Sequence, residues 1–209
     1  MEKVEVLFHS SIRIEKNKII YIDPFKIEEN VGDADYIFIT HDHYDHYSSE
    51  DIRVIKNSFT TIIIPKHVRG KALADGFEPD NIITVEPNKV YDVEDFYFET
   101  VPAYNIHSKF HPKDNGWVGY VIEIDGERFY IAGDTDATDE AKQVKCDIAL
   151  VPVGGTYTMD YKEAIELVNT IKPKTAIPIH YGSIVGTKLD AERFVQGLDQ
   201  NIEGKILMK

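Results

Sequence analysis

Short apolar runs separated by turn-forming residues follow one another through the first hundred residues, and they limit the fold more than any other feature of the sequence. Runs of this kind, rich in Ile, Val, Phe and Tyr, are typical of β-strands. The strands predicted in this region are residues 4–8, 12–14, 19–22, 36–39, 61–64, 82–85 and 96–101. Two short helices are expected between them, at residues 49–56 and, after Pro65, at residues 66–73.

The second half of the chain continues with strands and adds longer helices. Residues 117–124 and 128–132 flank Asp125-Gly126, a dipeptide typical of a two-residue β-hairpin turn. Further strands are predicted at residues 148–151, 175–179 and 205–208, and a last helix at residues 190–198.

A longer helix is expected after Asp160. Asp160 and Glu163 have the spacing of a capping box, and apolar residues then recur along one helical face until Pro173. No repeat, low-complexity tract or linker interrupts the chain. We therefore predict one domain over residues 1–209, an α/β (α+β) fold of mixed sheets covered by helices.

Composition limits the partners. With 23 Lys and Arg against 36 Asp and Glu, the net charge is -13, which disfavours polyanions such as nucleic acid or an anionic membrane. The single cysteine, Cys146, cannot form an internal disulfide and is expected to be a small core residue. The N-terminal residues lack the apolar segment of a secretory signal. We expect a cytoplasmic protein with a small-molecule substrate and neither a nucleic-acid nor a membrane partner.

A cluster of potential metal ligands follows the predicted strand 36–39, where His41, His43, Asp45 and His46 lie within six residues. In an extended backbone, residues two apart project to the same side, so His41 and His43 can bind one ion together. A turn into the next helix would direct Asp45 and His46 toward a second ion. Imidazole and carboxylate without thiolate favour zinc, with manganese or iron as substitutes. A polar surface loop is the alternative for this segment.

Two later positions supply what this cluster lacks. Asp134 follows a predicted strand and Gly133, and His180 ends another predicted strand before a turn. Loops at the ends of strands in a rigid sheet commonly carry metal ligands. Each residue alone would be an ordinary turn aspartate or partly buried histidine, but together with the first cluster they predict a metal site.

The motifs His-x-His-x-Asp-His, Gly-Asp-Thr and Ile-Pro-Ile-His-Tyr resemble the metallo-β-lactamase superfamily over about residues 4 to 182. Phe-His-Ser-Ser near the N-terminus and Ile-Asp-Pro-Phe after it resemble its compact branch, which includes ascorbate-6-phosphate lactonase-like proteins and uncharacterised metal-dependent hydrolases. The resemblance implies the metallo-β-lactamase fold, a four-layer αββα sandwich of two mixed β-sheets flanked by helices. It also implies two divalent metal ions, with zinc as the first choice.

The resemblance further assigns roles to the ligands. His41 and His43 would bind the first ion; Asp45, His46 and His180 would bind the second; and Asp134 would bridge the two. Asp45 or Asp134 would also act in catalysis by accepting a proton. Tyr104, Tyr157 and Tyr181 are candidate donors to the developing oxyanion or the leaving group, with packing in the core as the alternative for each.

One departure from the family pattern concerns the first ion. The family has a further histidine, often in Pro-Ala-x-His, where this chain has Pro-Ala-Tyr-Asn105. Either Asn105 serves as a weak oxygen ligand, or His107 or His111 takes the place of that histidine. We favour His111 because Pro112 restricts the chain beside it.

Two N-terminal residues are candidates for a further ligand or for a supporting role. His9 is either a residue at the metal edge or a strand-end histidine without a role, and Asp23 is expected to orient a ligand histidine.

The predicted activity is hydrolysis of a small ester, lactone or phosphoester by metal-bound hydroxide. The alternatives are a phosphodiesterase or nuclease of the same fold, a di-iron reductase and a non-catalytic metal-binding protein. His43 disfavours the reductase, because those relatives have a carboxylate there. A homo-oligomer is also expected, since a short chain has little room for a lid.

Overall fold

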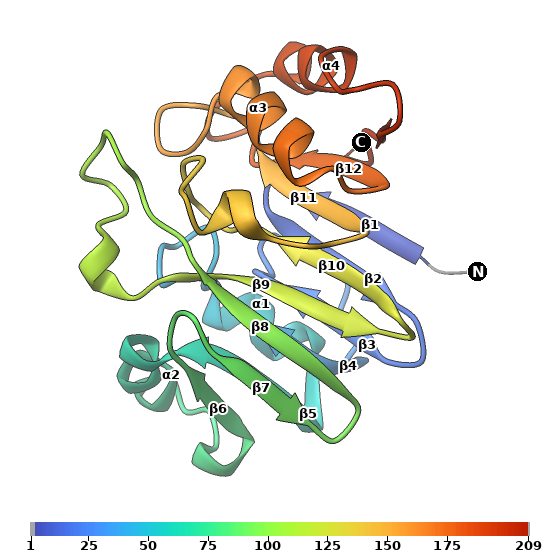
Figure 1. The fold of residues 1–209 in the computed structure, drawn as a ribbon. Coiled ribbons are helices and arrows are strands. Elements are labelled where there is room, and N and C mark those ends of the chain that lie inside the picture. The colour runs from blue at the N-terminus through green and yellow to red at the C-terminus, as the bar shows by residue number, and fades with distance from the viewer. Residues whose placement is uncertain (1–2, 209) are drawn as a thin grey trace. The chain divides into compact units, whose positions relative to one another are not determined.

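The computed structural model describes residues 3–208, and these form two compact units. The N-terminal unit runs to Glu86 and includes Met208, and the C-terminal unit runs from Pro87 to Leu207. Each unit contains one mixed β-sheet with its own helices (Figure 1). None of the helices within residues 3–208 combines the length and the apolar character that a membrane crossing requires.

The N-terminal unit is built on a six-stranded sheet. In spatial order its strands are β1 (Lys3–Phe8), β2 (Ser11–Glu15), β3 (Ile19–Ile22), β4 (Ala34–Phe38), β5 (Lys56–Pro65) and β6 (Ile82–Val85). The pairs from β1 to β3 are antiparallel and those from β3 to β6 are parallel. All six strands were predicted, and the predicted ranges of β3 and β6 match the structure at both ends.

Two short helices cover the core of this unit, α1 (Ser49–Ile55) and α2 (Arg69–Ala74). The hydroxyl of Ser48 caps α1 by accepting a hydrogen bond from the Asp51 N–H. Ile52 and Ile55 then pack into one buried cluster with Ile37 of β4. Each such side chain stabilises the unit by about 1.5–3 kcal/mol. The second predicted helix divides into a 3-10 turn, Lys66–Val68, and α2.

The C-terminal unit is built on a seven-stranded sheet. In spatial order its strands are β13 (Glu203–Gly204), β12 (Thr175–Ile179), β11 (Ile148–Pro152), β10 (Glu127–Ile131), β9 (Val118–Ile124), β8 (Phe96–Pro102) and β7 (Val90–Val93). The pairs from β7 to β10 are antiparallel and those from β10 to β13 are parallel. Helices α3 (Tyr161–Ile171) and α4 (Lys188–Gln196) pack against each other, with α3 on β11 and α4 on β12.

The local signals read from the sequence in this unit are confirmed. Asp125 and Gly126 have φ angles of 53° and 75°, the left-handed pair that the hairpin between β9 and β10 requires. The Asp160 side chain accepts hydrogen bonds from the N–H groups of Lys162 and Glu163, and the Glu163 side chain accepts one from the Asp160 N–H. The capping box therefore fixes the start of α3.

Three element predictions need correction. Residues 205–208 are not a strand: pairing with β12 ends at Gly204, and Met208 instead accepts a hydrogen bond from the His9 N–H through its sulfur. Strand β7 was missed because it is a partly exposed edge strand without a continuous apolar run. Helix α4 begins before residue 190, since Thr187 and Asp190 form its capping box.

Candidate metal centre

The first set of candidate metal ligands lies in the loop between β4 and α1 and is called here the N-terminal ligand set: His41, His43, Asp45 and His46. His41 and His46 are fully buried, Asp45 is buried, and His43 is half-buried. The His41 ring centroid lies 4.6 Å from that of His43 and 4.0 Å from that of His46. Four side chains from one loop therefore gather at one point of the unit.

The Asp23 side chain holds this loop in place through hydrogen bonds. Its carboxylate accepts hydrogen bonds from the Thr40 N–H at 2.8 Å, from the Thr40 hydroxyl at 2.7 Å, and from His46 Nδ1 at 2.7 Å. Complete burial raises the pKa of the Asp23 carboxyl, and the His46 and Thr40 contacts act against that shift. Asp23 is thus in contact with His46, as a carboxylate that orients a metal-binding imidazole would be.

These contacts assign the protons of two imidazoles. His46 Nδ1 faces a carboxylate and therefore carries the proton. The Thr40 hydroxyl donates to Asp23, so its oxygen is left to accept from His41 Nδ1 at 2.9 Å. Both Nε2 atoms consequently present lone pairs, the state in which imidazole binds a metal ion.

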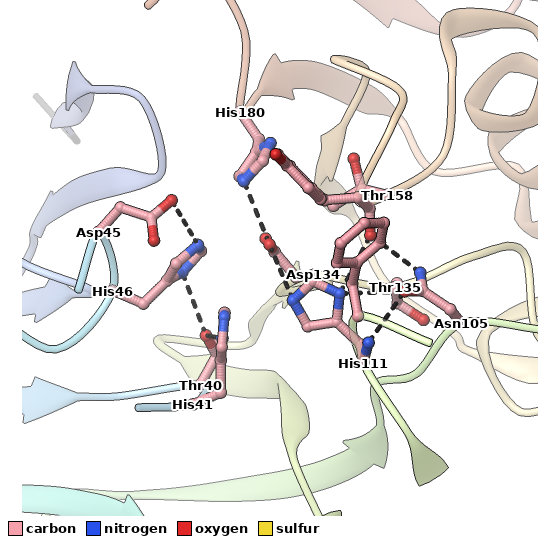
Figure 2. Close-up of polar contacts among 12 residues, drawn as sticks. Thr40, His41, Asp45, His46, Asn105, His111, Asp134, Thr135, Thr158 and His180 are labelled. Atoms are coloured by element: carbon pink, nitrogen blue, oxygen red, sulfur yellow. Dashed lines mark hydrogen bonds and ion pairs between the residues drawn. The ribbon is translucent and has the colours of Figure 1, made fainter. Parts of the chain in front are cut away.

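Asp45 lies between two imidazoles of the N-terminal unit. Its Oδ2 atom is 3.6 Å from His46 Nε2 and 3.5 Å from His9 Nε2 (Figure 2 shows the His46 contact). Two ligand atoms that share a tetrahedral zinc ion lie roughly 3.3 Å apart, given bonds of about 2.0–2.1 Å. The spacing around Asp45 thus suits shared coordination better than direct hydrogen bonding.

His9 is more constrained than its place at a strand end suggests. It is fully buried, and its φ angle of 53° lies in the left-handed region, which a non-glycine residue adopts at a cost of about 1–3 kcal/mol. Strain of this kind persists where neighbouring contacts hold it, and here the Met208 sulfur accepts from the His9 N–H at 3.2 Å.

The C-terminal ligand set is His111, Asp134 and His180. Asp134 follows β10, His180 follows β12, and His111 comes from the long loop between β8 and β9. Figure 2 shows the contacts of Asp134 with His111 and His180. Asp134 Oδ2 is 3.2 Å from His111 Nε2 and 3.1 Å from His180 Nε2, and none of the three side chains is more than 4% exposed. One carboxylate oxygen therefore faces two imidazoles.

Asn105, His107 and His111, the three candidates for the further ligand, differ in their contacts within this unit. The Asn105 Nδ2 group donates to Asp136 Oδ1 at 2.8 Å and to the Tyr157 carbonyl at 2.9 Å, which fixes the orientation of the amide. Its Oδ1 accepts from the His111 N–H at 3.0 Å and lies 3.1 Å from His111 Nδ1. Asn105 therefore orients His111, whereas the His107 side chain is exposed.

The same network assigns the His111 proton. His111 Nδ1 faces two acceptors, Asn105 Oδ1 and the Tyr157 carbonyl, each at 3.1 Å, so Nδ1 carries a proton. The Nε2 atom then faces the Asp134 carboxylate at 3.2 Å. A lone pair and a carboxylate held together in a buried place repel each other unless a cation lies between them. The imidazole and carboxylate donors of this set fit a divalent metal ion in that role.

His180 depends on a glycine that the sequence analysis did not single out. His180 has a φ angle of 57°, and a Cβ atom added at Gly154 would lie 2.2 Å from its carbonyl oxygen. The close approach of the two backbones requires glycine at position 154. The signal available in the sequence was the Gly154-Gly155 pair, which follows β11 after one residue, Val153.

The three candidate tyrosines differ in their contacts. The Tyr104 hydroxyl donates to Glu140, and the Tyr157 carbonyl accepts from Asn105 and His111. Tyr181 is 1% exposed, and its hydroxyl has no hydrogen-bond partner within residues 3–208. Burial also raises the pKa of Tyr181, so the hydroxyl keeps its proton.

Comparison with known proteins identifies the class. Residues 3–180 match the model of the beta-lactamase superfamily domain, and the chain belongs to the metallo-β-lactamase superfamily. Over 207 residues it is 30% identical to a metal-dependent hydrolase of Pyrococcus abyssi, in an alignment that covers 93% of this chain and 91% of the relative. The predicted fold class is confirmed.

Solved structures support the same fold. A candidate metal-dependent hydrolase from Parabacteroides distasonis is 29% identical, with a TM-score of 0.82 and coverage of 99% of this chain and 92% of the other. A diiron β-hydroxylase from Streptomyces venezuelae shares the fold at 13% identity, with a TM-score of 0.76 and coverage of 99% and 53%. A candidate metal-dependent hydrolase and a diiron β-hydroxylase therefore share this fold, so the fold alone does not fix the reaction.

Proposed function

We propose that this protein is a metal-dependent hydrolase that cleaves a small ester, lactone or phosphoester with two divalent metal ions, zinc being the first choice. One observation carries the proposal. The Nδ1 atoms of His46 and His111 each face a fixed hydrogen-bond acceptor, and the Nε2 atoms of the same two rings face carboxylates. The name metal-dependent hydrolase, carried by the relative from Pyrococcus abyssi, agrees with it.

The donor chemistry supports zinc. Seven side chains supply five imidazoles and two carboxylates and no thiolate, a set that zinc accepts and that manganese or iron also tolerate. The proposal keeps the division implied by the family resemblance. His41 and His43 would bind the first ion; Asp45, His46 and His180 would bind the second; and Asp134 would bridge them. His111 is added as the favoured further ligand of the first ion.

When bound, such ions would lower the pKa of a water molecule to about 7 and polarise the oxygen of the scissile group. The protein residues have three tasks around them. Asp23 and Asn105 keep His46 and His111 in the ligand tautomer. Asp45 or Asp134 accepts a proton, and Tyr181, with its hydroxyl protonated and uncommitted within residues 3–208, donates a hydrogen bond to the developing charge.

Three other functions compete with this one. The net charge of -13 argues against a nuclease, because a polyanion would be repelled before it reached the ions. A non-catalytic metal-binding protein would fill its sites and hydrolyse nothing. Oxygen-dependent chemistry is favoured by one observation, the shared fold with the diiron β-hydroxylase.

The test is a panel of nitrophenyl esters, lactones and phosphoesters, assayed with protein loaded with zinc, manganese or iron. We expect turnover that His46→Ala and His111→Ala reduce on the order of a thousandfold. The exposed His107 provides a matched control, and His107→Ala should keep wild-type turnover. Silence across the panel with metal bound would favour the non-catalytic alternative. Oxygen uptake by the iron form without hydrolysis would favour oxidation.

A further inference from the structure

We propose that Lys26 and the rings of Phe8, Phe25 and Tyr44 form a recognition site for an anionic group of the substrate. We call these four residues the aromatic shelf. The inference rests on the proposed function, because Tyr44 lies between the ligands His43 and Asp45. It names the substrate class as molecules that carry a carboxylate or phosphate next to an apolar segment.

The backbone of Lys26 is held in an unusual conformation. Its φ angle of 54° lies in the left-handed region, where an L side chain is strained. The Asp51 carboxylate in α1 enforces this turn by accepting from the Lys26 N–H at 3.1 Å and from the Ile27 N–H at 2.8 Å. The Asp51 carboxylate therefore fixes the backbone that carries the Lys26 side chain.

The turn sets the ammonium over two rings. Lys26 Nζ lies 4.5 Å from the Phe8 ring centroid and 5.6 Å from that of Phe25, and the two rings are 5.9 Å apart. These distances are within the range of cation–π attraction. The contact restrains the lysine while its three N–H donors stay available for an anion.

The Lys26 ammonium also differs from other lysines of this acidic chain. Lys66, Lys113 and Lys174 each have a carboxylate oxygen within 3.1 Å of Nζ. Within residues 3–208, no ion pair joins the Lys26 ammonium to a carboxylate, although the chain has 36 Asp and Glu. An anion that reaches this part of the unit meets a positive charge that is not already neutralised.

The shelf is continuous with the N-terminal ligand set. The Phe25 ring meets the Tyr44 ring edge-on with centroids 6.0 Å apart, and Tyr44 is 66% exposed. At the other end of the shelf, Phe8 precedes His9, whose Nε2 lies 3.5 Å from Asp45. Rings thus extend from the ammonium to the ligand loop, and the apolar part of a substrate would lie on them.

A neighbouring cavity indicates which side of the shelf the anion uses. Phe8 and Lys26 also line an open cavity of about 920 Å³ in the N-terminal unit, together with Glu5, Glu28 and Glu29. Carboxylates on that side would repel an anion. We therefore place the anionic group on the side of the shelf that carries Tyr44.

The first experiment measures binding to metal-free protein, so that no ion can capture the probe. Anilinonaphthalene sulfonate and its uncharged analogue phenylnaphthylamine are titrated by fluorescence. We expect the sulfonate to bind about tenfold more tightly than the neutral probe, and Lys26→Met to remove that difference. Lys162 is the matched control, because its Nζ also lies over a ring, 5.8 Å from the Tyr161 centroid. Lys162→Met should keep the difference, and an unchanged preference in Lys26→Met would overturn the proposal.

The second experiment uses the zinc-loaded enzyme and two nitrophenyl esters, the hemisuccinate and the uncharged pentanoate. Lys26→Met should reduce the preference for the hemisuccinate in kcat/KM about tenfold, mainly through KM, with metal content unchanged. An unaltered preference would contradict the inference. If the wild type hydrolyses neither ester, the proposed function is in doubt, whereas the probe titration still tests the shelf. Displacement of the sulfonate by phenyl phosphate or by benzoate identifies which anion is preferred.

Discussion

The N-terminal and C-terminal ligand sets reach similar chemistry by different routes. The N-terminal set comes from one loop, where four ligands lie within six residues and Asp23 braces them through Thr40 and His46. The C-terminal set comes from three loops that β8, β10 and β12 bring together. A local set depends on the conformation of one loop, whereas a dispersed set depends on the whole sheet behind it. Substitutions should therefore act differently on the two sets.

The largest effect is expected at the centre of the dispersed set. Asp134 Oδ2 faces both His111 and His180, so Asp134→Ala removes the one carboxylate that contacts both imidazoles. We expect turnover to fall on the order of a thousandfold and metal content to drop. Turnover assays and elemental analysis measure both. Wild-type turnover in Asp134→Ala with the metal retained would contradict the central role of Asp134 in the dispersed set.

A smaller effect is expected behind the local set. Asp23→Asn keeps the shape of the side chain but weakens its hold on His46, and second-shell changes typically cost about 10–100-fold in metal affinity. Thr40→Val removes one hydroxyl between Asp23 and His41 and should cost less. Competition with a chelator measures the affinities. Equal affinity in Asp23→Asn and wild type would mean that the loop holds its ligands without this brace.

The dispersed set should also respond to a remote backbone change. A Cβ at Gly154 would lie 2.2 Å from the His180 carbonyl oxygen, so Gly154→Ala must shift the His180 turn, at about 1–3 kcal/mol of unfolding free energy. Gly70 in α2 is the matched control. A Cβ there meets nothing within 4 Å, so Gly70→Ala should stabilise by about 0.5–1 kcal/mol. Denaturant titration distinguishes the two, and similar stability of both variants would contradict the close packing at Gly154.

The smallest effect concerns a residue outside both sets. Burial raises the pKa of the Cys146 thiol to about 12, against about 8.5 for a free thiol. The folded chain therefore holds this proton more tightly than the unfolded chain, and the stability contributed by the group is lost as the pH rises from about 8.5 to about 12. Iodoacetamide should react slowly at pH 8, with a rate that climbs toward pH 12. Rapid alkylation of folded protein at pH 8, measured against Cys146→Ser, would contradict this.

The same difference between the sets explains what could be predicted from the sequence. The cluster from His41 to His46 is visible as a string of residues, and local strand and capping signals located β3, β6 and α3 well. His111 could only be favoured over Asn105 and His107, because the choice depends on hydrogen bonds that Asn105 and His111 donate to Asp136 and to the Tyr157 carbonyl, which lie in distant segments. The role of Gly154 has the same cause, since it is a close approach between two loops.

The aromatic shelf could not have been found in the sequence either. Phe8, Phe25, Lys26 and Tyr44 are spread along the chain, and strand pairing together with the Asp51 contacts brings them together. Residues 205–208 show the opposite error, in which an apolar end looked like a strand and pairing with β12 stopped at Gly204. Local patterns identify elements, and tertiary contacts decide which residues meet.

The most direct test of the central claim, that the two ligand sets bind metal ions, is elemental analysis of protein purified without added metal or chelator. We expect about two equivalents of zinc, manganese or iron in the wild type and about one in His111→Ala. Asn105→Ala should retain its metal when no chelator is present and lose it to a chelator about 10–100-fold more readily than the wild type, since Asn105 orients His111. Absence of metal from the wild type, even after reconstitution with each of the three ions, would contradict the claim.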